Sequence, residues 1–140
     1  MSALSQVLAV HQRLYERSDG RVGHRMLGTP TLLLRTTGRR SGAQRTNALV
    51  YLADDGSYVV VASKGGDDKP PAWLLNLTAQ PNVEVQVGRE RRVATARVLQ
   101  RGEDDYERLW RLVNENNSGR YDGYQAKTER PIPLVILTPS

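Results

Sequence analysis

TLLLRTTGRRSGAQRTNALVYLA, residues 31–53, joins two apolar segments through a basic turn bracketed by glycines. The segments 31–37 and 46–53 are rich in Leu, Val and Thr, and this composition predicts two β-strands. Gly38 and Gly42 suit the turn between them, because glycine readily adopts the positive φ angles that tight turns require. The stretch therefore predicts two strands joined by a turn that carries several arginines.

Four further strand segments follow, mostly in hairpin-like succession. Asp54-Asp55-Gly56 is a hairpin signal between two apolar runs. Pro131 and Pro133 place the start of the last strand at a sheet edge or at its entry into the sheet. The four segments span residues 57–63, 83–87, 92–99 and 132–137.

Three helices are predicted from apolar spacing and proline placement. Residues 3–17 form an amphipathic pattern, and a late helix is expected from about 103 to 116. Pro70 and Pro71 open a short helix that ends before Pro81. Consecutive antiparallel strands covered by a few helices indicate an α+β fold with a curled sheet or barrel.

Length and composition bound the class of protein. The 140 residues predict one domain, with an N-terminal helical segment at 1–28 and the barrel at 29–140. The absence of Cys excludes disulfides, thiolate metal sites and Cys nucleophiles, and His11 and His24 make a poor metal site. No run approaches the ~20 apolar residues of a membrane span, and the N-terminus has no signal-peptide pattern, so we expect a cytoplasmic protein.

The positive charge is local. No acid lies between Asp19 and Asp54, and the six arginines of that interval exceed the net charge of +5 for the whole chain. A concentrated charge favours a focused anion site over the diffuse field of a nucleic-acid binder, although the pI of about 9.9 raises that class. Because the basic stretch lacks interleaved aromatics, we expect no nucleic-acid partner.

Four segments are candidates for a binding site. The arginine turn provides guanidinium, hydroxyl and backbone donors, as phosphate binding requires, but a solvated hairpin tip has the same composition. Lys64 and Gly65 directly follow a buried strand, where binding groups often collect, or form a turn in which Lys64 pairs with a nearby Asp. Trp73 and Asn76 share one helical face, which suits a planar heterocycle or a packed core.

Tyr121 and Tyr124 stand on a predicted loop that contains Gly123, and such a loop suits a lid or pocket wall. Two surface-packed tyrosines are the alternative interpretation. The sequence contains no credible Ser/His/Asp set and no pair of carboxylates flanking a cleft. Demanding chemistry must therefore come from a cofactor.

Three motifs, TTGRRSG at 36–42, ASKGG at 62–66 and PAWLLNL at 71–77, occur in an order and spacing that resemble the deazaflavin-dependent nitroreductase family of actinobacteria. The resemblance extends from about residue 31 to 99, and more weakly through the loop at Tyr121 to the final strand. It implies a split β-barrel similar to that of the FMN-binding, pyridoxamine-phosphate-oxidase-like proteins. It also implies use of reduced coenzyme F-420, an 8-hydroxy-5-deazaflavin with a phospholactyl-oligoglutamate tail, to reduce quinones, nitroaromatics or conjugated carbonyls.

By this resemblance, basic side chains bind the phosphate and acidic tail, backbone groups line the same path, and other residues frame the deazaflavin or face the acceptor. The tail-binding side chains are Arg39, Arg40, Arg45 and Lys64, and the backbone groups are those of Ser41, Gly42, Ala62 and Gly65. The residues that frame the ring or support its pocket are Asn47, Leu49, Trp73 and Asn76, and those that face the acceptor are Ser63, Tyr121 and Tyr124.

Departures from the family pattern affect the acceptor side. Ala48 and Val50 replace the proline and aromatic that often flank the residue equivalent to Leu49, and Lys127 stands in a late loop that carries more aromatics in some members. The alternatives are an FMN-dependent oxidoreductase on the same barrel and a non-catalytic F-420 carrier. Residues 3–25 are basic enough to contact an anionic membrane surface, and a monomer and a homodimer are both compatible with the sequence.

Overall fold

Residues 25–26 and 29–140 are described by the computed structural model of this chain. The predicted helix at 3–17, with its proposed membrane contact, lies outside the described residues. Strand β1 (Arg25–Met26) pairs antiparallel with the start of β2 (Thr29–Thr37). These two residues of the segment 1–28, which was expected to be helical, therefore belong to a short hairpin.

Strand β2 organises the sheet, because it has partners along both edges. It pairs antiparallel with β3 (Gln44–Val50) over seven residues and with β6 (Asn82–Val87) over four. Leu32, Leu33 and Leu34 of β2 are all fully buried, so this strand is covered on both faces. The predicted strands at 31–37 and 83–87 are thus confirmed.

The sheet continues from β6 through β7 (Glu90–Leu99), β8 (Leu134–Pro139) and β5 (Ser57–Val61) to β4 (Leu52–Asp54). All of these pairings are antiparallel. The predicted hairpin between β4 and β5 is confirmed by the positive φ of both turn residues, Asp55 and Gly56.

Strand β8 lies between β7 and β5, so of the two predicted alternatives, a sheet edge or an entry into the sheet, the structure has the entry. It begins one residue after Pro133, which has no N–H to donate, and Pro133 therefore marks the entry to the strand.

One residue closes the curled sheet. Tyr51 is the whole connection between β3, at one end of the strand order, and β4, at the other. Its N–H donates to the carbonyl of Pro30 (3.1 Å), and its own carbonyl accepts from the Asn116 side chain (2.9 Å). The segment 46–53 predicted as one strand is thus two, and the described residues hold seven strands plus the two-residue β1 instead of about six.

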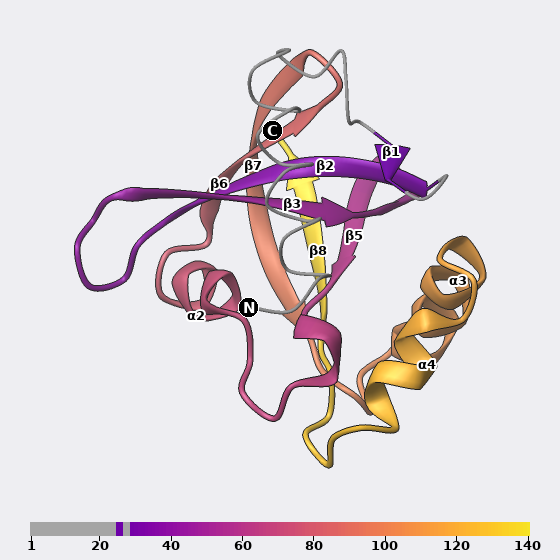
Figure 1. The fold of residues 1–140 in the computed structure, drawn as a ribbon. Helices are drawn as coiled ribbons and strands as arrows, with labels where there is room; N and C mark the ends of the chain where they lie inside the picture. The colour runs from indigo at the N-terminus through magenta and orange to yellow at the C-terminus, as the bar shows by residue number, and fades with distance from the viewer. Residues whose placement is uncertain (1–24, 27–28) are drawn as a thin grey trace.

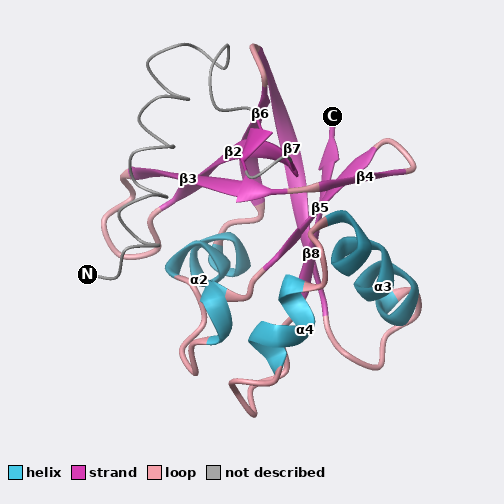
Figure 2. Ribbon diagram, turned by 45° about the vertical axis from the view of Figure 1, so that its right-hand side comes forward, coloured by secondary structure: helices cyan, strands magenta, loops and turns pink. Residues whose placement is uncertain are grey.

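The helices lie along one side of this split barrel (Figures 1 and 2). They are α2 (Ala72–Ala79), α3 (Tyr106–Asn116) and α4 (Arg120–Gln125), with a 3-10 turn η1 (Lys64–Gly66) directly after β5. Two of the helices, α2 and α3, confirm predicted segments. The third, α4, falls where a loop was expected, so that prediction was wrong.

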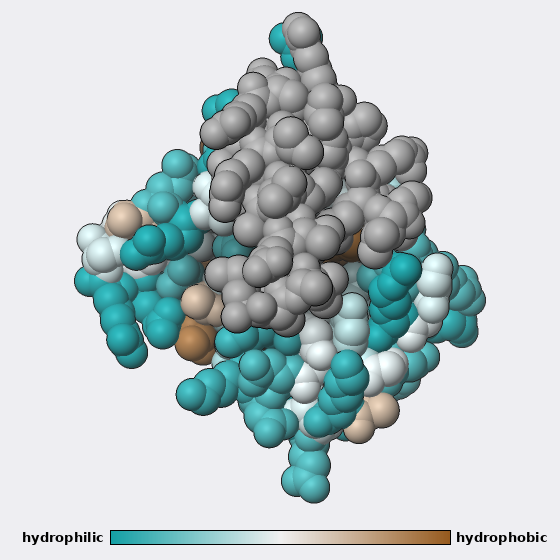
Figure 3. Space-filling view, in the orientation of Figure 1, coloured by the Kyte–Doolittle hydropathy of each residue, from teal (hydrophilic) through white to brown (hydrophobic). Residues whose placement is uncertain are grey.

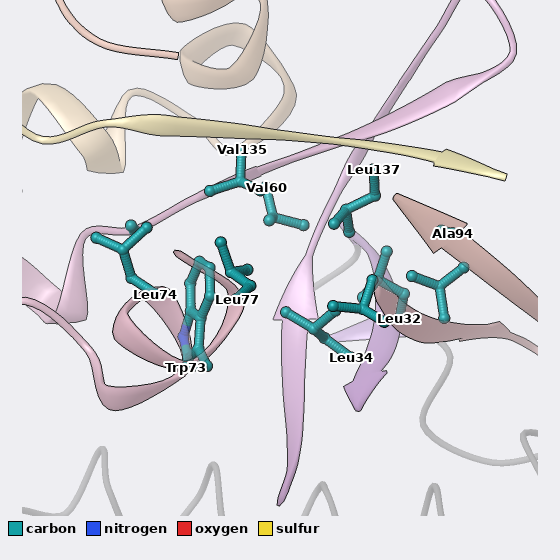
Figure 4. Close-up of a cluster of buried hydrophobic side chains, with 12 residues drawn as sticks. Leu32, Leu34, Val60, Trp73, Leu74, Leu77, Ala94, Val135 and Leu137 are labelled. Atoms are coloured by element: carbon teal, nitrogen blue, oxygen red, sulfur yellow. The ribbon is translucent and has the colours of Figure 1, made fainter. Parts of the chain in front are cut away.

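Two hydrophobic cores hold these parts together. One fills the barrel, where α2 directs Trp73, Leu74 and Leu77 towards buried residues of β2, β5 and β8 (Figure 4). The other lies between the opposite faces of β5 and β8 and the helices α3 and α4, and contains Tyr106 and Tyr121. At ~25 cal/mol per Å² of buried apolar area, both cores contribute strongly to stability.

Candidate functional site

The turn between β2 and β3 is closed by its own hydrogen bonds. Gly38 N–H donates to the Ala43 carbonyl (2.7 Å), Gly42 N–H to the Gly38 carbonyl (2.8 Å), and Ala43 N–H to Ser41 Oγ (3.2 Å). Gly42 has φ 74°, as the predicted turn requires. Its N–H, predicted to line an anion path, is therefore occupied inside the turn, whereas the N–H of Ser41 has no partner among the described residues.

The arginines around this turn differ in what they contact. Arg35 lies outside the predicted site, and its guanidinium is taken by Glu84 (3.2 Å) and Gln86 (2.9 Å). The side chains of Arg40 and Arg45 are exposed and form no hydrogen bond or ion pair with any described residue. The surface around the turn is largely hydrophilic, at the left of Figure 3. Uncompensated guanidinium groups on a rigid turn attract anions with planar oxygen sets, such as phosphate and carboxylate.

Asn76 of α2 ties the turn to the helix. Its Oδ1 accepts from both the N–H (3.1 Å) and Nη1 (3.2 Å) of Arg39, and its Nδ2 donates to Thr36 Oγ1 (3.4 Å). Asn76 is buried, so these bonds replace its contact with water. Of its two predicted roles, framing the ring or supporting the pocket, the geometry fits support.

Strand β3 presents a graded row of side chains beside α2. Arg45, Asn47 and Leu49 alternate along one face of β3 and pair in register with Thr36, Leu34 and Leu32 of β2. Leu49 packs against the barrel core and Asn47 is half-buried, whereas Arg45 is exposed. The row thus runs from apolar to cationic, as an amphipathic ligand with a flat apolar ring and an anionic tail requires. Trp73 lies within the adjoining core and forms part of its packing.

The segment after β5 has an unusual backbone. Ser63 is right-handed helical, whereas Lys64, Gly65 and Gly66 have φ of 46°, 64° and 86°. Right-handed followed by left-handed residues form a nest, in which successive N–H groups converge on one point and bind an anion. The N–H groups of Ser63, Lys64 and Gly65 have no partner among the described residues, so this nest is available to a ligand.

Side chains around the nest are suited to an anion. Lys64 Nζ lies 4.0 Å from Asp67 Oδ2, at the limit of an ion pair, and both side chains are about half exposed. Such a pair contributes little stability and leaves the ammonium available. The pKa of Asp67 is lowered, chiefly by the hydrogen bond from Lys69 N–H, so this carboxylate stays ionised and tied to its own loop.

Ala62 differs from its neighbours, because both of its backbone groups are occupied. Its N–H donates to the Pro133 carbonyl (3.1 Å) and its carbonyl accepts from Arg130 (3.2 Å). Ala62 is also fully buried. The backbone group predicted to line the anion path at this position therefore supports the loop from behind.

Helix α4 brings the predicted acceptor-side residues beside the nest. A Cβ on Gly66 would lie 2.5 Å from the carbonyl oxygen of Tyr124, so η1 and α4 pack backbone to backbone. Tyr124 is half-buried, with Lys127 Nζ 5.8 Å from the centre of its ring. Its ring meets that of Tyr121 edge to face at 6.1 Å between centroids. Ser63, Lys64, Gly65 and the two tyrosines therefore gather at one end of the barrel.

Tyr121 is more enclosed than a lid residue would be. Its side chain is 6% exposed and belongs to the core between β5, β8 and the helices. Burial raises the pKa of its phenol to about 12, while a hydrogen bond with Asn117 acts in the opposite direction. The hydroxyl is therefore protonated at neutral pH and is a hydrogen-bond donor.

Helix α2 joins the two segments that are expected to bind an anion. The nest precedes its N-terminal end, and Asn76 in its second half holds the arginine turn. In Figure 2, α2 and α4 both lie beneath the sheet, and η1, which precedes α2 in the chain, contacts α4. The residues present fit a ligand that has a flat ring and a long anionic tail. Among the described residues, no three His, Asp or Glu side chains form a group that holds a metal ion.

Sequence reasoning missed one residue of this site and one contact of another. Thr36 belongs to the segment expected to offer hydroxyl donors to a ligand, and in the structure its Oγ1 accepts from Asn76. Arg130 was not considered, although its guanidinium donates to carbonyls of the 62–67 segment. Its position before Pro131 carries no motif signal.

Solved structures define the fold class. A heme storage protein of Vibrio cholerae superimposes with a TM-score of 0.63 at 16% identity over 95% of this chain and 90% of that chain. A pyridoxamine 5'-phosphate oxidase-type protein of Listeria innocua superimposes with a TM-score of 0.55 at 14% identity over 79% of this chain and 83% of that chain. The chain therefore has the split-barrel fold, as predicted.

More similar relatives define the family. The model of the F420H(2)-dependent quinone reductase family matches residues 7–139, and the chain belongs to this family. It is 49% identical over 134 residues to the F420H(2)-dependent quinone reductase Rv1261c of Mycobacterium tuberculosis, covering 95% of this chain and 90% of that protein. A solved F420-H2 dependent reductase, FDR-A, is 41% identical with a TM-score of 0.69, covering 77% of this chain and 93% of that chain. The predicted family is thus confirmed.

Proposed function

We propose that this protein transfers a hydride from reduced coenzyme F-420 to a quinone. The observation that supports the proposal most strongly is the nest of three N–H groups at Ser63, Lys64 and Gly65, next to the Lys64 ammonium. This nest suits the cofactor phosphate. The exposed Arg40 and Arg45 suit the carboxylates of the oligoglutamate tail.

The remaining site residues then have defined tasks. The reduced deazaflavin supplies two electrons and a proton together as a hydride. Asn47, Leu49 and the wall backed by Trp73 would hold the ring and orient its donating carbon towards the acceptor. A hydroxyl of Ser63, Tyr124 or Tyr121 donates a hydrogen bond to the quinone oxygen that gains negative charge, and one proton completes the hydroquinone.

The acceptor range is a further part of the proposal. Nitroaromatics and conjugated carbonyls are electron-poor in the same sense as quinones, so they are candidate acceptors. The FMN alternative receives no support from the family or from the relatives at 49% and 41% identity, which are named for F-420. No helix within the described residues combines the length and apolar character needed to cross a membrane.

The test is a fluorescence titration of the purified protein with oxidised F-420, with FMN in parallel. We expect saturable binding of F-420 and much weaker binding of FMN. Menadione added to the F-420H2-loaded protein should then restore the absorbance of oxidised F-420 with turnover. Binding without turnover would identify a carrier, and binding of FMN alone would contradict the proposal.

The oligomeric state is a separate question with its own measurement. A solved structure described as a domain-swapped dimer superimposes with a TM-score of 0.72 at 37% identity, covering 97% of this chain and 99% of that chain. Monomer and homodimer were both compatible with the sequence, and we propose the homodimer on this likeness. Multi-angle light scattering of the purified chain should give twice the monomer mass of 15.6 kDa.

A further inference from the structure

Arg130 is directed entirely at backbone oxygens. Its Nη1 donates to the Ala62 carbonyl (3.2 Å), its Nη2 to the Ser63 carbonyl (3.1 Å), and its Nε (3.2 Å) and Nη2 (2.9 Å) to the Asp67 carbonyl. No carboxylate among the described residues forms an ion pair with it. A guanidinium whose planar donors bond to three carbonyls of one loop fixes the shape of that loop.

We infer that Arg130 is a positioning residue that orients the anion-binding nest, an inference that rests on the proposed function. The reason lies in peptide geometry. In a planar trans peptide, the carbonyl and the N–H of the same unit point in opposite directions. The carbonyls of Ala62 and Ser63 point at Arg130, so the N–H groups of Ser63 and Lys64, which belong to the same two units, point away from it. These are two of the three N–H groups of the nest.

The nest also needs an external constraint. Lys64 has φ 46°, a left-handed conformation that non-glycine residues rarely adopt, and two left-handed glycines follow it. Short-range bonds from Gly66 N–H to the Ser63 carbonyl (2.9 Å) and from Asp67 N–H to the Lys64 carbonyl (3.2 Å) close the turn. They do not by themselves set the orientation of the turn towards the barrel. The bonds from Arg130, together with the packing of Gly66 against α4, set it.

Arg130 is itself held on both sides of its backbone. Its N–H donates to Thr128 Oγ1 (3.1 Å), and Thr128 Oγ1 donates to Asp68 Oδ1 (2.6 Å). Its carbonyl accepts from Gln125 Nε2 (2.8 Å), and Gln125 is the last residue of α4. Arg130 and its partners therefore connect α4, which carries Tyr121 and Tyr124, to the loop that carries the nest.

A second role is compatible with the charge of Arg130, namely direct attraction of the anion. The two roles separate in Arg130→Lys, because lysine keeps the charge but its ammonium lacks the planar fork that reaches three carbonyls. Positioning predicts that the lysine variant loses affinity, whereas direct attraction predicts that it retains it. Arg130→Gln removes both the charge and the fork.

The experiment measures dissociation constants for two probes, intact F-420 and 8-hydroxy-5-deazaflavin without the phospholactyl-oligoglutamate tail. We expect F-420 binding to weaken ~10-fold in Arg130→Lys and ~10- to 100-fold in Arg130→Gln, the range for losing hydrogen bonds to a charged group. Binding of the tail-less ring should be unchanged in both variants. Arg108→Gln is the matched control, because Arg108 is also multiply hydrogen-bonded, but to Asp54 and Asp105 instead of the nest loop.

Each outcome decides between distinct conclusions. Wild-type F-420 affinity in Arg130→Lys would overturn the positioning role. Equal weakening of both probes would also overturn it, because it would indicate a general loss of the site. Failure of the wild-type protein to bind F-420 would instead contradict the proposed function, and the two failures are therefore distinguishable.

Discussion

The arginines near the two ends of α2 differ in what they bind. Beside its second half, the side chains of Arg40 and Arg45 are exposed without a partner among the described residues, at a turn that is closed by its own hydrogen bonds. In the loop that precedes its first turn, the carbonyls accept the hydrogen bonds of the Arg130 guanidinium. The difference indicates what decides the role of a guanidinium. Where the nearby backbone has unpaired carbonyls, the guanidinium bonds to them and supports the loop, and where it has none, the guanidinium stays available to a ligand.

At the N-terminal end of α2, the loop 62–67 is most sensitive to substitution at the contact between Gly66 and α4. Gly66→Ala combines a left-handed φ of 86° with a Cβ 2.5 Å from the Tyr124 carbonyl oxygen. We expect a loss of about 3 kcal/mol in the free energy of unfolding, from strain and overpacking together. Gly65→Ala is the control: it has φ 64° but open space around its Cβ, and should cost about 1 kcal/mol. Urea unfolding measures both, and equal costs would contradict the backbone contact.

Burial of Tyr121 makes the free energy of unfolding depend on pH. Its folded-state pKa of about 12 is above the value of 10 in the unfolded chain. Its contribution to stability is therefore complete below pH 10 and is lost as the pH rises towards 12, by about 3 kcal/mol for two units of pKa. The stability difference between wild type and Tyr121→Phe should shrink over that window. A difference that is constant with pH would show that the phenol is not enclosed as described.

Asn76 tests the tether between α2 and the arginine turn. Asn76→Ala leaves the Arg39 N–H without its side-chain acceptor and Thr36 without its donor. We expect a loss of about 2 kcal/mol in unfolding free energy, as for a buried polar group left unsatisfied. Asn82→Ala is the control, because Asn82 is exposed and bonds only its neighbour Gln80 among the described residues. Chemical denaturation should leave that variant close to wild type.

Arg40 should separate binding from stability most clearly, with the smallest effect of the series. Arg40→Ala removes no hydrogen bond formed with a described residue, so the urea midpoint should not change. The F-420 dissociation constant should rise about tenfold at low salt and less at high salt, because exposed charges are screened. Arg108→Ala should behave in the reverse way, losing stability through its Asp54 bonds while F-420 affinity is kept. A change in the urea midpoint of Arg40→Ala would show that Arg40 also supports the fold, and would contradict the contrast drawn between it and Arg130.

The sequence predicted the strands well, because their signal is local. Alternation and β-branched content placed 31–37 and 83–87 within two residues of β2 and β6. The break at Tyr51 was missed, since neither glycine nor proline marks it. It arises from the closure of the sheet, which depends on pairings far apart in the chain.

Helix α4 was missed because its signals point to a loop. Gly119 precedes it with φ 73°, and Gly123 lies within its six residues. Glycine disfavours an isolated helix by ~1 kcal/mol. Here Tyr121 is buried against α3 and β8, and this packing outweighs the local preference. Tertiary contacts of this kind are not visible in a single sequence.

The candidate site was predicted in part, for a chemical reason. Side chains that bind anions, such as Arg40 and Lys64, are evident from residue type and neighbouring glycines. Arg130 was not, because its partners are carbonyls, which every residue carries. Which carbonyls remain unpaired follows from φ angles and strand ends, and these appear only in the folded chain.

The one-residue joint at Tyr51 constrains how this chain tolerates changes in length. Side chains of a strand alternate between two faces, so one residue added there would reverse the faces of β4 relative to β3. The turn at 100–105 has no such constraint, because it connects β7 to a helix that lies outside the barrel. Insertions should therefore be accepted before α3 and rejected at Tyr51, which makes the joint a poor place to lengthen the chain and the 100–105 turn a suitable place to attach a tag or a second domain.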